Sequence, residues 1–281
     1  MRSGVAGKAA LGTITTLVIL FLFLPLTVVV AFSFNGGSDA FLWGGFSTSA
    51  YGQIPQDTTL LQALWTSLEV AGACAVLSVA VGLVGGIAAA GRGWPPRILF
   101  LLFVVVLATP EIVGASGDLL WFVTLGLSNG YLRLIVAHSV FGGALTALIV
   151  RGRALGLDRA VFEAAHDLGA GTMTVLRTVT VPLLAPALLA GGLLAFTFSL
   201  EDLVTSVFVS TAQATPLPVF ILGSLHAEFH TDIFAIAVVM FVVTSGAFLA
   251  ALAAMGGGSR ARMRRGIRLL AAPGPANADA T

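Results

Sequence analysis

The chain has 281 residues, of which 57% are hydrophobic and only 10% are charged, and its formal net charge is +1. Soluble domains carry about 25% charged residues, so this composition excludes a soluble single domain, and it equally excludes intrinsic disorder. The single cysteine, Cys74, lies in an apolar run and can form neither an internal disulfide nor a cysteine-based metal site. We expect it to be a buried, small apolar residue.

Six long apolar stretches follow one another along the chain, each near the roughly 20 residues that cross a bilayer as a helix. They cover residues 11–33, 62–90, 98–122, 132–150, 183–209 and 232–255. Lipid offers the backbone no hydrogen bonds, so spanning segments are helices or closed barrels, and continuous apolar runs favour helices. The sequence therefore predicts an all-α membrane protein with six transmembrane helices in one domain over residues 11–255.

The first stretch has two interpretations, a cleaved signal peptide or a membrane span. Its apolar run from Leu17 to Phe34 is longer than the usual signal-peptide core, and no clear small-x-small site follows. We interpret it as an uncleaved span after a short tail over residues 1–10.

Prolines and glycines inside the apolar stretches indicate how the helices bend and pack. Pro25, Pro110 and Pro186 are expected to kink their helices, which membrane helices tolerate. Gly82 and Gly86 form a small-xxx-small pair that suits close helix packing.

The basic residues indicate the orientation, because Lys and Arg are enriched in cytoplasmic segments. With the N-terminus inside, every basic residue except Arg133 falls in an inner segment. These residues are Arg2, Lys8, Arg92, Arg97, Arg151, Arg153, Arg159, Arg177, Arg260, Arg262, Arg264, Arg265 and Arg268. We therefore expect both termini in the cytoplasm and a multi-pass protein of the bacterial inner membrane. Residues 256–281 are expected to form a basic, disordered tail. Its arginines suit contact with the lipids of an anionic inner leaflet, and we interpret them as a positive-inside anchor.

Several chemistries are not expected. The only lysine is Lys8, so the chain has no P-loop and does not hydrolyse ATP by that route. His226 and His230 have a spacing that can bind a metal on a helix, but they lie in an expected outer loop, and we interpret them as solvated. We expect no metal, no cofactor and no nucleic-acid partner, and we expect His138 to be packed and hydrogen-bonded rather than a ligand.

One inner segment, residues 151–182, is unusually long and contains a motif. It reads Glu163-Ala164-Ala165-His166-Asp167-Leu168-Gly169 and, after nine intervening residues, Val179-Thr180-Val181-Pro182. This resembles the E-A-A-x3-G-x9-I-x-L-P signature of ABC importer permeases. The glutamate, both alanines, the glycine and the proline match, and the two valines are conservative departures.

The resemblance implies a type I ABC importer permease fold, in which this loop couples to an ATPase. It also implies partners, namely a homodimeric ATPase subunit that hydrolyses the ATP, a second permease subunit that forms a heterodimer with this one, and an extracytoplasmic substrate-binding protein. By contrast, a secondary cation carrier that acts alone has no need of this motif.

The residues of the motif suit this role on physical grounds. Ala164 and Ala165 on a short helix allow a partner surface to approach closely, and Gly169 permits a turn with positive φ. The segment Thr172–Thr178 is expected to resume the helix, and this helix is expected to stop at Pro182, where the next span begins.

Further segments resemble the spermidine/putrescine-type permeases. They are Thr109-Pro110-Glu111-Ile112-Val113 and Phe196-Thr197-Phe198-Ser199-Leu200-Glu201-Asp202-Leu203-Val204, where that family reads approximately S-P-D-I-V and S-F-T-x-S-M-D-D-V-V. The resemblance covers residues 10–255. It implies a polyamine or similar small organic cation as substrate, with iron chelates, thiamine and opines as alternatives. Glu201 departs from the aspartate that the family tends to have.

Acidic residues inside the apolar stretches are functional candidates, because each costs about 2.5–3.5 kcal/mol at mid-helix. They are Glu69, Glu111, Asp118, Glu201 and Asp202. Glu111 and Asp118 share nearly one helix face about 10 Å apart, so they could hold two ammonium groups of an oligoamine. Glu201 and Asp202 diverge by about 100° on a helix, so only one is expected to face the pathway. The alternative is structural, with each acid protonated, hydrogen-bonded or paired with the second permease.

Overall fold

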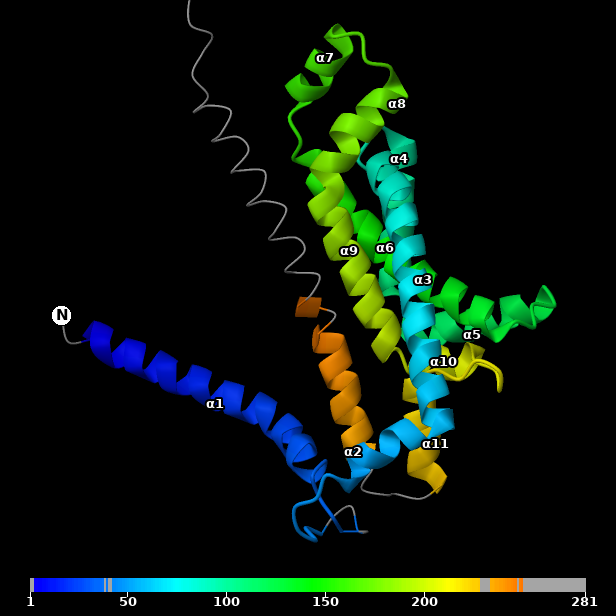
Figure 1. Cartoon of the computed structure of the whole chain (residues 1–281). Coiled ribbons are helices and arrows are strands. Elements are labelled where there is room, and N and C mark those ends of the chain that lie inside the picture. Colours follow the sequence, from blue (N-terminus) through cyan, green and yellow to red (C-terminus); the bar gives the residue numbers. More distant parts are fainter. Residues whose placement is uncertain (1–2, 38, 40–41, 228–232, 247, 250–281) are drawn as a thin grey trace, which may run out of the picture.

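The computed structural model describes all residues except 1–2, 38, 40–41, 228–232, 247 and 250–281 (Figure 1). The described part is helical, with two isolated bridges, Asn35–Phe46 and Thr211–Ala214, and no strand among its residues. Its helices are α1 (Ser3–Phe32), α2 (Ser49–Gln53), η1 (Ile54–Gln56), α3 (Thr58–Ala89), α4 (Trp94–Ala108), α5 (Glu111–Thr124), α6 (Gly130–Leu155), α7 (Arg159–Asp167), α8 (Thr172–Val175), η2 (Leu176–Thr180), α9 (Val181–Glu201), α10 (Val204–Val209) and α11 (Leu217–Ala227). A further apolar helix covers Ile233–Gly246.

The expected all-α membrane fold is confirmed. Four helical segments of the described chain, Leu11–Phe32, Thr58–Ala89, Gly130–Leu155 and Thr172–Glu201, are long and apolar enough to cross a bilayer, and α4 with α5 makes a fifth if the bent pair counts as one span. The sixth expected span is described only in part, as the helix over Ile233–Gly246. Most of the remainder of that stretch and the basic tail over 256–281 lie outside the described residues.

The third apolar stretch is not the single helix that we expected over 98–122. Helix α4 ends at Ala108, α5 begins at Glu111, and their axes differ by 104°. Thr109 lies between them with ψ of 129°, an extended conformation that the ring of the following Pro110 imposes. Helix α5 therefore runs across the direction of α3 and α9 (Figure 1).

The fifth stretch is also interrupted, so the expectation of one helix over 183–209 is wrong. Helix α9 ends at Glu201, Asp202 is extended with ψ of 107°, and α10 begins at Val204. No proline lies at this break. The side chain of Asp202 instead accepts a hydrogen bond from the Thr205 N–H at 2.8 Å, in the first turn of the new helix.

The core of the molecule is formed by α3, α6 and α9, which pack side by side through small residues (Figure 1). Gly82 and Gly86 of α3 are buried against α6, as expected. A Cβ added to Gly86 would lie 2.7 Å from the Cβ of Val150, and one added to Gly82 would lie 2.7 Å from the Cβ of Thr146. Close approach of the backbones, rather than large apolar side chains, therefore sets the spacing of these helices.

Helix α1 extends away from this core, and its apolar side chains are exposed in the single chain (Figure 1). Its C-terminal end is attached by ring contacts of Phe32 with Trp43 and Phe234. The following segment is ordered by Asn35, whose side-chain amide donates to Leu42 O and whose oxygen accepts from Gly44 N–H.

Candidate functional site

The inner loop contains a short exposed helix, α7, that carries the Glu-Ala-Ala motif. Asp158 begins this helix by accepting a hydrogen bond from the Ala160 N–H at 3.0 Å. Glu163 and Ala164 are exposed, and Ala165 is half-buried. Helix α7 lies at one end of the molecule, beyond the ends of α3, α6 and α9 (Figure 1), where its outer face is open to a partner.

Gly169 makes the turn that we expected after this helix. Its φ is +79°, a conformation that strains any residue with a Cβ. The turn is closed by two backbone hydrogen bonds, from Gly169 N to His166 O at 2.8 Å and from Ala170 N to Ala165 O at 3.1 Å. This pairing is the usual way to end a helix with a left-handed glycine.

Pro182 does not stop a helix, contrary to our expectation. Helix α8, the π-turn η2 and α9 form one continuous helical segment over residues 172–201. The wider turn of η2 immediately precedes the proline, with Val181 N bonded to Leu176 O. A π-turn accommodates a proline because it relieves the clash between the ring and the carbonyl one α-turn earlier.

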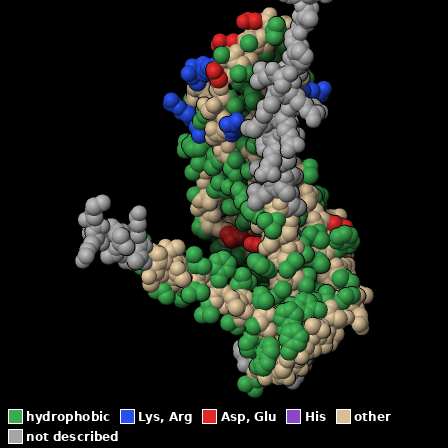
Figure 2. Space-filling view, turned by 60° about the vertical axis from the view of Figure 1, so that its left-hand side comes forward, with side chains coloured by type: hydrophobic (Ala, Val, Ile, Leu, Met, Phe, Trp, Pro, Cys, Tyr) green, Lys and Arg blue, Asp and Glu red, His purple; other side chains and the backbone are tan. Residues whose placement is uncertain are grey.

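Arginine side chains gather at the end of the molecule that carries α7 (Figure 2). Two of them tie helix ends together. Arg151 of α6 donates from Nε to Ala89 O at 3.0 Å, at the end of α3, and Arg153 donates from Nε to Leu183 O at 3.5 Å, at the start of α9. Both contacts lie at the end of the molecule that the sequence predicts to face the cytoplasm.

A cavity of about 250 Å³ lies between α4, α5, α6 and the α9–α10 break. Glu111 and Asp118 both line it, as their spacing on one helix face predicted. Thr109 and Thr205 add hydroxyl groups, and the other lining residues are Val106, Leu107, Gly114, Ala115, Ala137, Val140, Phe141 and Phe198. The cavity therefore combines two carboxylates with a largely apolar wall.

Two aromatic rings form part of that wall. Phe141 of α6 and Phe198 of α9 stack with ring centroids 4.1 Å apart and planes inclined by 21°. The face of an aromatic ring attracts a cation through its quadrupole. The sequence does not predict a role in the pathway for either ring, because a phenylalanine in an apolar stretch carries no functional signal of its own.

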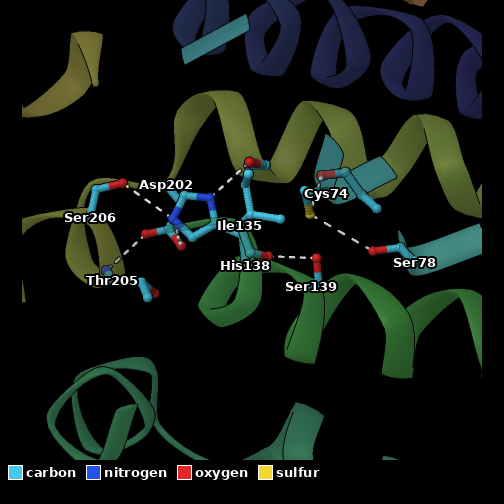
Figure 3. A network of polar contacts seen from close by, with 10 residues as sticks. Cys74, Ser78, Ile135, His138, Ser139, Asp202, Thr205 and Ser206 are labelled. Carbon is cyan, nitrogen blue, oxygen red and sulfur yellow. Dashed lines mark hydrogen bonds and ion pairs between the residues drawn. The ribbon is translucent and has the colours of Figure 1, made fainter. Parts of the chain in front are cut away.

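Asp202 lies behind the cavity in a buried polar network (Figure 3). Its Oδ2 atom is 3.5 Å from Nε2 of His138, whose Nδ1 is 2.7 Å from Ser199 Oγ. Ser206 Oγ is 3.3 Å from the same Nε2. His138 is thus packed and hydrogen-bonded, as expected. Asp202 also accepts a hydrogen bond from the N–H of Thr205, which lines the cavity, and this contact connects the network to the cavity.

The remaining acids of the apolar stretches do not line this cavity. Glu201 is exposed, whereas its neighbour Asp202 is buried, so the two adjacent acids have different environments. Glu69 is exposed on α3. In the space-filling view, acidic side chains also appear in a hollow midway down one face, away from the arginines (Figure 2).

The described residues contain no group of three or more potential metal ligands. His226 lies in the last turn of α11, and His230 lies outside the described residues. Cys74 is buried, as expected, with its sulfur 3.8 Å from Ser78 Oγ.

Solved structures of ABC importers share this fold. A bacterial ABC transporter involved in the import of the acidic polysaccharide alginate matches with a TM-score of 0.66 at 17% identity, over 91% of this chain and 98% of the other. A chain of the MetNI methionine ABC transporter matches with a TM-score of 0.61 at 17% identity, over 70% and 94%. The fold is therefore that of a type I ABC importer permease, as the sequence motif implied.

Sequence comparison identifies the family. Residues 80–255 match the family described as binding-protein-dependent transport system inner membrane component. The putrescine transport system permease protein PotI of Escherichia coli is 33% identical over 77% of this chain and 80% of its own length. The spermidine/putrescine transport system permease protein PotC of Haemophilus influenzae is 34% identical over 80% and 88%.

The chain belongs to the family of inner-membrane components of binding-protein-dependent transport systems. It is a permease subunit of an ABC importer, and it works in the inner membrane with an ATPase and a binding protein. This assignment replaces the alternative of a secondary carrier that acts alone.

Proposed function

We propose that this chain forms half of the translocation pathway of a polyamine importer, with putrescine or spermidine as substrate. The cavity lined by Glu111 and Asp118 carries this proposal. Polyamines alternate ammonium groups with short methylene chains. Two carboxylates separated by two helical turns suit the charged groups, while the apolar wall suits the methylenes.

The size of the cavity and the residues of its wall suit a substrate that is a small, flexible cation. Its volume of about 250 Å³ is below the roughly 300–1,000 Å³ of pockets for drug-sized ligands. The stacked rings of Phe141 and Phe198 offer a cation–π surface beside the acids. The similar permeases PotI and PotC are named for putrescine and spermidine.

Residues 163–182 couple this pathway to the ATPase in our proposal. Glu163, Ala164 and Ala165 contact the ATPase surface, and Gly169 sets the angle between α7 and the helical segment that contains Pro182. ATP binding brings the two ATPase subunits together and moves α7. Because α8, η2 and α9 are continuous, that movement reaches the α9–α10 break at Asp202 without an intervening hinge.

The complete transporter in this proposal contains a second, different permease chain, a homodimeric ATPase and an extracytoplasmic binding protein. The exposed apolar side chains of α1 require cover from lipid and from that second permease. ATP hydrolysis belongs to the ATPase, so this chain is not itself an enzyme. Residues 11–255 form the permease domain, with both termini and the tail over 256–281 in the cytoplasm.

Uptake by the reconstituted transporter tests the proposal. Glu111→Gln and Asp118→Asn keep the shape of each side chain and remove its charge. Each is expected to reduce labelled spermidine uptake at least about tenfold, because a charged hydrogen bond is worth about 1.5–3 kcal/mol. Glu69→Gln is the matched control, since Glu69 is an exposed acid outside the cavity.

Wild-type polyamine uptake in both cavity variants would contradict the proposal that the cavity of Glu111 and Asp118 is part of the translocation pathway. A second adverse result is an assembled transporter that instead couples ATP hydrolysis to import of an iron chelate, thiamine or an opine. That result would contradict the proposed polyamine substrate and leave the assignment to ABC importer permeases unchanged.

A further inference from the structure

A second cavity lies at the arginine-rich end of the molecule, beside the loop that joins α3 to α4. Its volume is about 390 Å³, and it is lined by Ala89, Gly91, Arg92, Gly93, Arg97 and Arg151. Three guanidinium groups from two parts of the chain therefore face one space. Our proposed function places coupling in residues 163–182 and cation binding in the cavity of Glu111 and Asp118, so it assigns no role to this second cavity.

One of these arginines is held rigidly. Arg151 donates from Nε to Ala89 O at 3.0 Å, and its guanidinium carbon is 4.0 Å from the ring centroid of Phe100. Arginine has five N–H donors, so this anchoring leaves further donors of Arg151 for a ligand. A guanidinium fixed in this way loses little entropy when it binds an anion.

The loop that carries Arg92 is also held in one shape. Gly93 has a φ of +104°, which a residue with a Cβ rarely adopts. A Cβ added to Gly91 would lie 3.0 Å from Cγ of Pro96. Glycine is thus favoured on both sides of Arg92, by the backbone conformation at Gly93 and by the close approach of Pro96 at Gly91.

The charge of this cavity is not neutralised within the described part of the chain, where no acidic residue forms an ion pair with Arg92, Arg97 or Arg151. The N-terminus of α4 adds the positive end of its dipole. Because Pro95 and Pro96 have no N–H, the hydrogen bonds to a ligand come mainly from the guanidinium groups. These features select an anion with several acceptor oxygens, such as a phosphate group.

The surface next to the cavity indicates where the anion comes from. Trp94 is 72% exposed, and exposed tryptophan is typical of the level of the lipid headgroups. Ile98, Leu101 and Val105 follow it at intervals of four, three and four residues and are exposed as well. This spacing puts all four side chains on one stripe of α4 that leads from the arginines into the hydrocarbon region.

We propose that this cavity binds the phosphate group of an anionic phospholipid from the inner leaflet, with an acyl chain along the stripe formed by Trp94, Ile98, Leu101 and Val105. Arg92 and Arg97 hold the phosphate oxygens together with the anchored Arg151. Basic pockets between membrane helices on the cytoplasmic side are suited to such headgroups. The proposal does not rest on polyamine as the transported substrate.

The test is lipid binding to the purified full-length chain in detergent, with labelled phosphatidylglycerol and, for comparison, labelled phosphatidylcholine. We expect the wild type to prefer phosphatidylglycerol at least tenfold. Arg92→Gln/Arg97→Gln is expected to weaken phosphatidylglycerol binding about thirtyfold, equivalent to about 1 kcal/mol for each arginine, and to leave phosphatidylcholine binding unchanged. Both side chains are exposed, so the variant retains its fold, and Arg92→Lys/Arg97→Lys should restore part of the affinity.

The control removes two charges from the same end of the molecule, as Arg159→Gln/Arg177→Gln, and should leave phosphatidylglycerol binding within twofold of the wild type. An equal loss in this control would overturn the proposal in favour of general attraction to the basic end. Full displacement of the lipid by millimolar inorganic phosphate would overturn it in favour of a free-anion site. Unchanged phosphatidylglycerol binding in Arg92→Gln/Arg97→Gln would also overturn the proposal, because these two arginines would then not hold the phosphate group.

Discussion

The imidazole of His138 lies 3.5 Å from the carboxylate of Asp202, which is the residue that separates α9 from α10. Both side chains are fully buried. Ser199 bonds the other ring nitrogen, and the second carboxylate oxygen accepts from Thr205 N–H. A single buried pair therefore joins α6 to both helices at the break, directly behind the cavity that Glu111 lines.

Asp202→Ala is expected to lower the stability of the protein in detergent by about 1–3 kcal/mol. The substitution removes the side-chain acceptor of an N–H in the first turn of α10, a type of bond worth about 0.5–2 kcal/mol, and leaves the buried His138 with one partner fewer. Asp202→Asn keeps an oxygen that can accept from Thr205 N–H and should cost less. Thermal unfolding followed by circular dichroism measures both variants.

A transport assay distinguishes a structural role of Asp202 from a role in the translocation pathway. We expect Asp202→Asn to reduce uptake of a cationic substrate more than it reduces assembly with the ATPase, because it removes a negative charge behind the cavity, next to the cavity-lining Thr205. Uptake equal to that of the wild type, in a variant that assembles normally, would assign Asp202 to the stability of the break alone.

Gly169→Asp is expected to weaken coupling to the ATPase while the protein remains in the membrane. A residue with a Cβ at φ of +79° costs about 1–2 kcal/mol, so the turn changes shape and α7 tilts away from its partner. Co-purification of the ATPase and substrate-stimulated ATP hydrolysis measure the effect, and both should fall several-fold.

Gly171→Asp is the matched control for this loop. It adds the same charge two residues later, but Gly171 has an ordinary φ of −70° at the N-terminal cap of α8, where aspartate is favoured. Equal losses in the two variants would show that the added charge, and not the turn at Gly169, disturbs coupling.

Asp118→Asn tests whether the two cavity acids bind separate ammonium groups. Asp118 is two helical turns from Glu111, about 10 Å along the axis, so a longer amine reaches it more readily than a shorter one. We expect the KM for spermidine to rise more than the KM for putrescine, with Glu111→Gln affecting both. Equal effects of Asp118→Asn on the two substrates would assign both acids to a single ammonium group.

The inner loop and the helix packing could be predicted from the sequence because their signals are local. The turn at Gly169 needs only a residue without a Cβ, and the contact of Gly86 with α6 needs only small residues one turn apart. The shared face of Glu111 and Asp118 follows from helical periodicity alone. This prediction is therefore confirmed even though the helix that carries the two residues is shorter than expected.

The two helix breaks show what local signals do not contain. Pro110 was expected to kink a helix, but the 104° change of direction depends on how α5 packs in the molecule. The break at Asp202 has no proline or glycine, and the partner of Asp202 is His138, which is 64 residues earlier and on another helix. The continuous helix through Pro182 likewise depends on a π-turn that composition does not reveal.

Gly86→Ala is expected to destabilise the packing of α3 against α6, because the new Cβ would lie 2.7 Å from the Cβ of Val150. Overpacking of this kind costs about 1–3 kcal/mol. Gly72→Ala on the same helix is the matched control, since no atom lies within 4 Å of its added Cβ; that change should be neutral or stabilise by up to about 1 kcal/mol. Thermal unfolding of both variants in one detergent distinguishes the effects. If Gly86→Ala unfolds at the same temperature as Gly72→Ala, α3 and α6 do not pack as closely as the structure describes, and the spacing of the core must be set by the larger side chains around Val150 and Leu184.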